Sequence, residues 1–405
     1  MRKWLVIIAL FVVGTVAWGQ TDSLRLGYTA QGTVVDAATG RPLESVHVSI
    51  PGRSQATVTN ADGYFVIKSD KPIGNVRCSY MGFKTRTVKG GSGLWITLQR
   101  ESMELTEALV VSGNAKDIVQ MAVDRIWDTY CPKAQLLECF YRETLRKRNR
   151  YTYVAEAVAR MYKAAYNGAI SADAAALEKS RVLVSQRRTD TLSVKTQGGP
   201  TTAITMDLVK NSAILFNKEE MSLYNYELLP TTFIGDRPQF VVKMTPNANV
   251  EYALYYCTVY IDRELLTFTR VEASLDMRDR GKATQMMLIS KPLSLRFFPQ
   301  ECSVVMNYRL EDGYTRLEYF RSTMRFACDW RKRLFRTNYT AVNELVVTDV
   351  RPDVKPIRRQ ERFRPKDFLN EKAREFQDPD FWKDYNIIEP SESLENAISR
   401  LKRNQ

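Results

Sequence analysis

The sequence predicts a mainly β fold: a small N-terminal β-sandwich, an α+β domain with a large curved antiparallel sheet, and a helical C-terminal tail. Short alternating apolar runs with turns between them fill residues 31–98, whereas longer aromatic-rich runs with hairpin turns fill residues 238–350. The expected divisions are a signal peptide (1–19), the sandwich (28–100), a linker and helix (101–132), the sheet domain (133–350), and a basic Pro-rich segment with C-terminal helices (351–405).

The first residues have the pattern of a secretory signal peptide. Arg2 and Lys3 precede the apolar run 4–13, and Ala17 and Gly19 supply small residues at the positions that a signal peptidase reads. We expect cleavage near Gly19 and an exported mature chain, with an uncleaved anchor as the alternative. No later segment reaches the roughly 18 apolar residues of a membrane helix.

Charge and cysteine content limit the partners and the chemistry. The net charge is +13 and the sequence pI is about 9.4. For an exported basic protein, this charge favours anionic lipid headgroups, lipopolysaccharide or acidic proteins as partners, and not nucleic acid. The six cysteines form no CxxC or zinc-ribbon spacing. Disulfides and isolated buried thiols both stay open for them.

The sandwich elements follow from alternation and turn residues. Val46, Val48 and Ile50 fall on one face of a strand, with His47 and Ser49 on the other. Gly40 and the turn at 60–63 provide the reversals that join short strands. Another expected strand ends at residues 33–36, and further strands are expected at 64–67, 76–80 and 94–98.

Three motifs in this region resemble a known family. Gly32-x-Val34-x-Asp36 with Thr39-Gly40-x-Pro42-Leu43, then Asp62-Gly63-x-Phe65, then Tyr80-x-Gly82-Phe83 resemble the carboxypeptidase regulatory-like domain. The resemblance implies a transthyretin-like, seven-stranded sandwich, common in exported proteins of Bacteroidetes. Residues 104–113 are similar to the segment that follows this domain in TonB-dependent transporters, but too few residues remain for a plug and a large barrel. Residues 117–157 resemble uncharacterised Bacteroidetes envelope proteins, which implies a location and no catalytic residues.

The middle of the chain predicts a helix followed by strands. Residues 115–131 place Ile118, Ala122, Ile126 and Trp127 at helical spacing. Strands are expected at 139–145 and 151–161, a short helix or loop at 172–176, extended chain at 182–185, and a helix or lid at 206–215.

The strand pattern is strongest from residue 238 to 350. Residues 240–244, 255–262, 268–277, 304–310, 314–319, 325–330 and 339–347 read as strands of a curved sheet. The hairpin with Tyr260-Ile261-Asp262 and Arg270-Val271-Glu272 is similar to one in LolA-like half-barrel carriers, which implies a half-barrel. On this reading, the side chains that line an apolar ligand cavity are Tyr255, Tyr260, Phe268, Phe297 and Phe298; ordinary core packing is the alternative.

The tail reads as an extended basic segment followed by helices. Residues 351–366 hold seven Lys or Arg and three Pro. We expect Arg358, Arg359, Arg362 and Arg364 to contact an anionic surface, or to be solvated in a linker that lies over the sheet. Pro365 is expected to open a helix through about residue 376. Ser391 or Ser393 should cap a last helix whose apolar face comprises Leu394, Ala397, Ile398 and Leu401.

Most catalytic constellations are missing from the sequence. The only histidine, His47, is predicted to face solvent, and a single histidine excludes a His-Glu-His zinc site. No GxSxG, P-loop or GxGxxG motif occurs. We predict no catalytic, cofactor-binding or metal-binding residue, although a carboxylate-only hydrolase stays open. The carboxypeptidase resemblance does not imply peptidase activity.

Two functions from different classes remain. The first is a non-enzymatic envelope protein whose sandwich is an interaction module and whose sheet binds a lipid, another hydrophobic ligand or an envelope protein. The second is a structural or assembly protein of the outer membrane that binds a protein partner and whose sheet is filled by its own side chains. The first function predicts a cavity of several hundred Å³ lined by apolar side chains, and the second predicts none.

Overall fold

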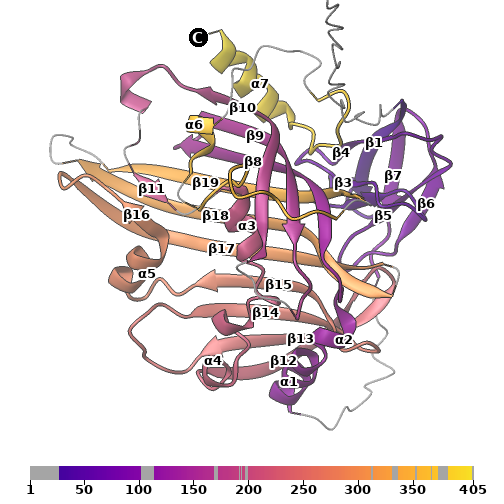
Figure 1. The fold of residues 1–405 in the computed structure, drawn as a ribbon, viewed down its shortest axis with the longest axis horizontal. Coiled ribbons are helices and arrows are strands. Elements are labelled where there is room, and N and C mark those ends of the chain that lie inside the picture. Colours follow the sequence, from indigo (N-terminus) through magenta and orange to yellow (C-terminus); the bar gives the residue numbers. More distant parts are fainter. Residues whose placement is uncertain are drawn as a thin grey trace, which may run out of the picture.

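The computed structural model describes residues 27–101, 114–167, 172–190, 192, 194–196, 199–311, 313–330, 336–351, 354–365, 367–372 and 382–403. Figure 1 shows a small strand-rich body beside a large curved sheet, with helices on both faces of the sheet. The expected signal peptide (1–19) and the transporter-like segment (104–113) lie outside the described residues.

The N-terminal body is the predicted seven-stranded sandwich. One sheet has the order β4-β1-β7 and the other β3-β2-β5-β6; all pairs are antiparallel except β1 with β7, which is parallel. Gly63 has a φ of +71°, and a Cβ there would lie 2.5 Å from the carbonyl oxygen of Val34, so this turn requires glycine. The strands are β1 (Tyr28–Asp36), β2 (His47–Ser49), β3 (Ala56–Val58), β4 (Tyr64–Ser69), β5 (Asn75–Ser79), β6 (Arg86–Lys89) and β7 (Leu94–Leu98).

The second body is built on a ten-stranded antiparallel sheet with the order β10-β9-β8-β19-β18-β17-β15-β14-β13-β12. Alternation within each strand sends apolar side chains to an inner face, around which the sheet curves. The strands are β8 (Gln135–Lys147), β9 (Arg150–Lys163), β10 (Ala174–Val184), β12 (Tyr224–Ile234), β13 (Arg237–Pro246), β14 (Tyr255–Asp262), β15 (Phe268–Leu275), β17 (Leu295–Glu311), β18 (Tyr314–Trp330) and β19 (Thr337–Arg351). The small pair β11 (Lys195–Thr196) and β16 (Leu288–Ser290) is separate.

The inner face is covered by short helices and by an insert of residues 200–223. Ile204, Leu208 and Phe216 of this inner-face insert pack in one cluster with Tyr141, Val259 and other inner-face residues. The insert was expected as a helix or a lid at 206–215, and it is a short helix, turns and a 3₁₀ segment. The helices are α1 (Ala115–Asp124), α2 (Ile126–Thr129), α3 (Pro200–Thr205), α4 (Lys218–Met221), α5 (Arg280–Met287), α6 (Leu369–Lys372) and α7 (Glu392–Lys402), with 3₁₀ turns at Arg188–Asp190 and Ser212–Ile214.

The opposite, outer face carries the sandwich and residues 382–403. Phe140, Val158 and Val346 form a cluster there with Trp382 and with Val58 of the sandwich. Asn386 joins the two bodies: its Oδ1 accepts from Lys68 N at 2.7 Å, and its Nδ2 donates to Lys68 O at 3.0 Å. Helix α7 has Ser391, one of the two predicted caps, as its N-cap and buries the predicted apolar face, Leu394, Ala397, Ile398 and Leu401.

Three local expectations were wrong. Residues 174–176 belong to strand β10, not to a helix or loop, because their backbone pairs with β9, and Ala174 and Ala176 are buried against Ile357. Trp127 is 71% exposed, because the predicted helix breaks at Arg125 into α1 and α2. The helix expected from Pro365 through about residue 376 begins only at Leu369, and residues 373–376 lie outside the described part of the chain.

All six cysteines are buried free thiols. Burial raises the pKa of Cys78, Cys302 and Cys328 to about 12, so these thiols are protonated at neutral pH. Within the described part of the chain, the helices are too short or too polar to cross a membrane.

Candidate binding sites

The five aromatic residues predicted to line a ligand cavity do not gather around one. Phe268 is buried and stacks on Phe216 with 4.7 Å between ring centroids. Phe297 stacks on Phe326 at 4.9 Å in a separate cluster, and Tyr255 packs against both clusters.

Tyr260 and Phe298 lie on the outer face, where the Arg336 guanidinium sits 3.9 Å from the Phe298 ring centroid. The proposed ligand contact of these aromatic residues stays a prediction.

A cavity of about 360 Å³ does lie on the inner face, beside the inner-face insert and beneath the C-terminal segment. Its floor comes from alternate residues of neighbouring strands, because side chains two apart on a strand share a face. Its volume is at the lower end for small-molecule sites. The apolar residues that line it are Leu145, Val184, Leu192, Val194, Ile289, Phe326, Ala341, Pro365, Phe368 and Leu369.

The charged groups of this cavity are all acidic. Glu143 accepts hydrogen bonds from Tyr141 Oη at 3.0 Å and from Tyr153 Oη, and burial raises the pKa of Glu143. Asp190 is neutralised from outside the lining by Lys147 at 3.2 Å and Arg150 at 2.5 Å. Asp367 and Glu371 complete the charged lining, which contains no Lys or Arg among the described residues. The cavity is therefore suited to an apolar ligand without negative charge.

A buried charge network fastens the inner-face insert to the sheet. Lys163 Nζ lies 2.7 Å from Asp207 Oδ2 and 3.5 Å from Asp173 Oδ2, and Lys210 Nζ lies 2.5 Å from Asp173 Oδ1. Asp207 and Lys210 belong to the insert, whereas Lys163 ends β9 and Asp173 precedes β10. The Tyr166 ring lies between the two ammonium groups, 5.1 and 5.9 Å from them.

The network is satisfied as well as buried. Asp207 accepts from Tyr166 Oη at 2.9 Å and from Tyr308 Oη at 2.7 Å. Burial by itself would raise the pKa of Asp207, but Lys163 and these hydrogen bonds hold it below its ordinary value. Burial and the charge of Lys163 lower the pKa of Lys210, against the attraction of Asp173. The arrangement gives the insert a fixed position and leaves no access for a ligand.

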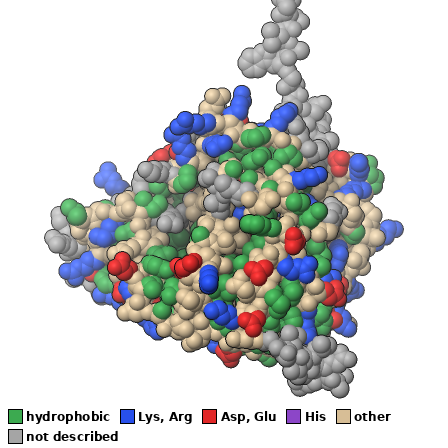
Figure 2. All heavy atoms as spheres, turned by 60° about the horizontal axis from the view of Figure 1, so that its bottom comes forward, with side chains coloured by type: hydrophobic (Ala, Val, Ile, Leu, Met, Phe, Trp, Pro, Cys, Tyr) green, Lys and Arg blue, Asp and Glu red, His purple; other side chains and the backbone are tan. Residues whose placement is uncertain are grey.

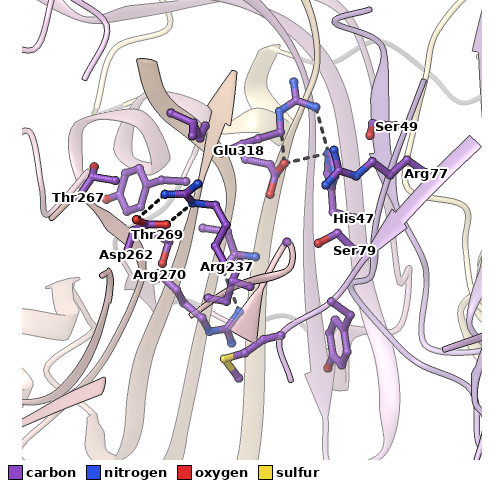
Figure 3. Close-up of a pocket in the computed structure, with 18 of the residues that line it drawn as sticks. His47, Ser49, Arg77, Ser79, Arg237, Asp262, Thr267, Thr269, Arg270 and Glu318 are labelled. Carbon is purple, nitrogen blue, oxygen red and sulfur yellow. Dashed lines mark hydrogen bonds and ion pairs between the residues drawn. The ribbon is translucent and has the colours of Figure 1, made fainter. Parts of the chain in front are cut away.

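A second cleft, of about 310 Å³, lies between the sandwich and the outer face of the sheet (Figure 3). Its sandwich wall comes from β2 and β5, where His47 is opposite Ser79 and Ser49 is opposite Arg77. Alternate residues share a face, so these four polar side chains point away from the sandwich core and toward the sheet.

The sheet wall of this interdomain cleft carries arginines held in place by neighbours. Arg237 forms a two-pronged pair with Asp262, with Nη2 and Oδ1 at 2.8 Å. Arg270 donates from Nε to Glu272 at 2.7 Å and from Nη1 to Asn307 at 2.8 Å. Such planar, multiply bonded guanidinium groups have little freedom left to lose on binding a ligand.

His47 is not solvent-facing, which corrects the expectation for it. The side chain points away from the sandwich core as predicted, but it is only 12% exposed, and Nε2 lies 2.8 Å from Glu318 Oε1. Arg309 Nε is 3.6 Å from the same carboxylate. Burial by itself would raise the pKa of Glu318, but His47 and Arg309 hold it below its ordinary value. The sheet covers this face, which the pattern of one strand does not reveal.

The basic tail lies over the edge of the sheet. Phe363 bridges to Ala175 of β10 and is buried, so the residues beside it are fixed on β10. Figure 2 shows basic, acidic and hydrophobic side chains intermingled on the face it draws. Contact of the tail with an anionic surface stays a prediction.

The four tail arginines differ in their surroundings. Arg358 is exposed and paired with Glu361, Arg359 and Arg364 are exposed, and Arg362 is half-buried and donates to Ile357 O at 3.0 Å.

Sequence reasoning missed both the buried network and the arginines of the interdomain cleft. In His47-Val48-Ser49 and in Arg77-Cys78-Ser79, the alternation places the polar side chains on one face of each strand. Their partners come from strands that are distant in the sequence. No group of three or more His, Cys, Asp or Glu is placed to hold a metal ion in the described part of the chain.

Comparison with known proteins identifies one domain. Residues 30–111, about a fifth of the chain, match the CarboxypepD_reg-like domain family, which confirms the resemblance seen in the motifs of this region. No curated protein matches the chain.

Solved structures resemble the larger domain only weakly. A LolA superfamily protein from Nitrosomonas europaea is 13% identical with a TM-score of 0.18, covering 61% of this chain and 98% of that one. A DUF1329 family protein from Desulfovibrio piger is 11% identical with a TM-score of 0.24, covering 59% of this chain and 92% of that one. At these scores the likenesses carry no argument about function.

Proposed function

We propose that this protein is a non-enzymatic, exported binding protein of the periplasm or outer membrane that holds an uncharged apolar ligand in the inner-face cavity. The observation that carries the proposal is the cavity of about 360 Å³ itself, lined by ten apolar residues from the sheet and from segments that lie over it. The match to a regulatory-like domain and the signal-peptide pattern support an exported binding protein.

The charges of the cavity select the ligand. Glu143 and the other lining carboxylates face no lining cation, so a carboxylate ligand would meet repulsion as well as loss of hydration. A neutral chain, such as the acyl group of an ester or amide, meets neither cost. The pair of tyrosine hydroxyls on Glu143 keeps that carboxyl group satisfied whether or not a ligand is present.

One observation favours the second reading, an assembly protein that binds a protein partner. Most of the inner face is filled by the molecule's own side chains, including Ile204, Leu208 and Phe216 of the insert. The two readings differ in what the cavity holds when the protein is purified gently from its own envelope. Native mass spectrometry should detect a neutral lipid at near-unit stoichiometry if the proposal holds, and a bound protein with an empty cavity if the alternative holds.

A cavity-filling substitution tests the site directly. Ala341 lines the cavity from β19, so Ala341→Trp should reduce binding of the neutral dye N-phenyl-1-naphthylamine by about tenfold or more, as measured by fluorescence titration. Dodecanol should displace the dye from the unaltered protein better than dodecanoate. The matched control is Thr340→Trp, one residue away and on the opposite face of the strand. Equal dye binding by both folded variants would refute the proposal.

A further inference from the structure

We propose that the interdomain cleft is a second binding site, independent of the inner-face cavity, for an acidic carbohydrate: a sugar ligand that bears carboxylate or phosphate groups. The cleft joins residues of both domains, so the site exists only when the sandwich is docked on the sheet. Its lining combines guanidinium groups with hydroxyl and amide groups, the two kinds of partner that such a ligand needs (Figure 3).

The cationic part of the lining is entirely arginine. Arg77 comes from the sandwich, and Arg237, Arg270 and Arg309 come from the sheet; no lysine lines this cleft. Arginine presents a planar fork of donors that matches carboxylate and phosphate oxygens, which a lysine ammonium does not.

Several of these donors remain available. Arg77 is 46% exposed, and its only partner in the described part of the chain is Asp236, at 3.9 Å from Nη2. Arg270 uses Nε and Nη1 for Glu272 and Asn307, which leaves Nη2 without a hydrogen bond among the described residues. The carboxylates that hold these arginines, Asp236 and Glu272, lie outside the cleft lining.

The two carboxylates inside the cleft are already neutralised. Asp262 is paired with Arg237 and also accepts from the backbone N–H groups of Glu264 and Leu265. Glu318 lies between His47 and Arg309. Arg237 and Arg309 are further paired with Glu264 and Glu311 outside the lining, so the donors open to a ligand are those of Arg77 and Arg270. An anion entering the cleft therefore meets unpaired donors, not unpaired carboxylates.

The polar uncharged lining suits the rest of a sugar. Ser45, Ser49 and Ser79 line the sandwich wall, and Thr269 and Asn307 line the sheet wall. Short hydroxyl and amide side chains can both donate to and accept from sugar hydroxyls. Ser49 lies opposite Arg77 in the strand register, and Ser79 lies opposite His47. The serine hydroxyl groups of this wall are therefore next to the arginine.

The space open to a ligand extends beyond the cleft itself. It continues into a hollow of about 810 Å³ that shares Ser49, Arg77, Arg309 and Leu310 with it. This hollow adds Arg53, Arg316 and Lys71 to the cationic side, against Asp70 and Glu311. Arg309 and Arg316 both pair with Glu311, whereas Arg53 donates to Ser69 and to Pro72 O and keeps its charge for an acidic group of an oligosaccharide.

Arg77 is the residue to change, because its side chain is half exposed and its loss leaves no buried group without a partner. Isothermal titration calorimetry of the full chain with tetragalacturonate should give binding that Arg77→Glu weakens by about tenfold or more. Arg41→Glu is the matched control: it makes the same charge change on an exposed residue of the sandwich outside the cleft, and it should leave affinity within about twofold. Maltotetraose, a neutral tetrasaccharide, should not bind.

A second arm distinguishes a free acidic glycan from one carried on a lipid. Lipopolysaccharide micelles replace tetragalacturonate as the probe, with the same two variants. Binding of either probe that depends on Arg77 and not on Arg41 supports the site and identifies its source. Equal weakening by both variants would show a general effect of net charge, and absence of binding to both probes would leave no carbohydrate site; either result overturns the proposal.

Discussion

The charged network of the inner face and the charged lining of the interdomain cleft are paired to different degrees. On the inner face, Lys163, Asp173, Asp207 and Lys210 are buried and paired with one another, with donors and acceptors satisfied, and they fasten an insert. In the interdomain cleft, Arg77 of the sandwich and Arg270 of the sheet are only partly paired, and donors of both guanidinium groups have no hydrogen bond among the described residues. Charged groups that are all paired hold the insert on the sheet. Arginines that are only partly paired at the interface between the two domains can bind a ligand.

Removing one partner of the inner network should have the largest effect. Asp207→Ala leaves Lys163 buried beside a carboxylate 3.5 Å away and leaves Tyr166 and Tyr308 without their acceptor. We expect the free energy of unfolding to fall by about 3–5 kcal/mol, measured by urea denaturation. Lys243→Ala, which breaks a pair whose two side chains are about half exposed, should cost no more than about 1 kcal/mol. Similar losses in the two variants would contradict the contrast.

The interdomain pair should matter less, because one partner remains. His47→Ala removes the 2.8 Å contact with Glu318 but leaves Arg309 Nε at 3.6 Å from that carboxylate. The expected loss is about 1–2 kcal/mol in the same assay. His47→Gln retains a side-chain N–H donor and should recover part of the loss. A loss as large as that of Asp207→Ala would show that the outer face is fastened as tightly as the inner one.

The smallest effect concerns pH, and its sign differs between two carboxylates of the inner side. Asp207 has a lowered pKa in the folded protein. Its stabilising contribution to folding is therefore present above its unfolded pKa of 3.8 and is lost as pH falls through the folded pKa. Glu143 has a raised pKa in the folded protein. Its stabilising contribution to folding is therefore present below its unfolded pKa of 4.5 and is lost as pH rises through the folded pKa.

Glu143→Gln, which imitates the protonated carboxyl group, should therefore flatten the pH dependence of stability just above pH 4.5. Urea denaturation at several pH values between 4.5 and 7 would measure it. An unchanged slope would show that Glu143 ionises normally in the folded state.

Local patterns predicted the elements whose information is local. The strands 94–98 and 255–262 were expected with the bounds that β7 and β14 have. Their apolar alternation and the turns that flank them can be read from neighbouring residues. A helix cap at Ser391 or Ser393 and the apolar face of the helix that follows were expected for the same reason. The first part of strand β10 was missed, because Ala174–Ala176 become strand through pairing with β9, which their own sequence does not encode.

The candidate sites were beyond local reasoning. Aromatic side chains were chosen for the cavity because they are large and apolar, but Phe268 and Phe297 fill the core by stacking on Phe216 and Phe326. Lys163 and Asp207 are separated widely in sequence, and nothing around either residue indicates that it is buried. Arg77 and Arg270 meet only because the sandwich docks on the sheet, so a single strand cannot predict the cleft.

The pairing of β8 with β19 imposes an order of events on the growing chain. Leu136 lies opposite Arg351, so the two halves of the ten-stranded sheet join through residues near its beginning and its end. The sandwich can close as soon as residue 98 is available, whereas the sheet must wait for its last strand. During that interval β8 presents an unpaired edge, which is a surface on which other chains can add a strand. Protection of that edge before synthesis is complete is therefore a requirement that the topology itself creates.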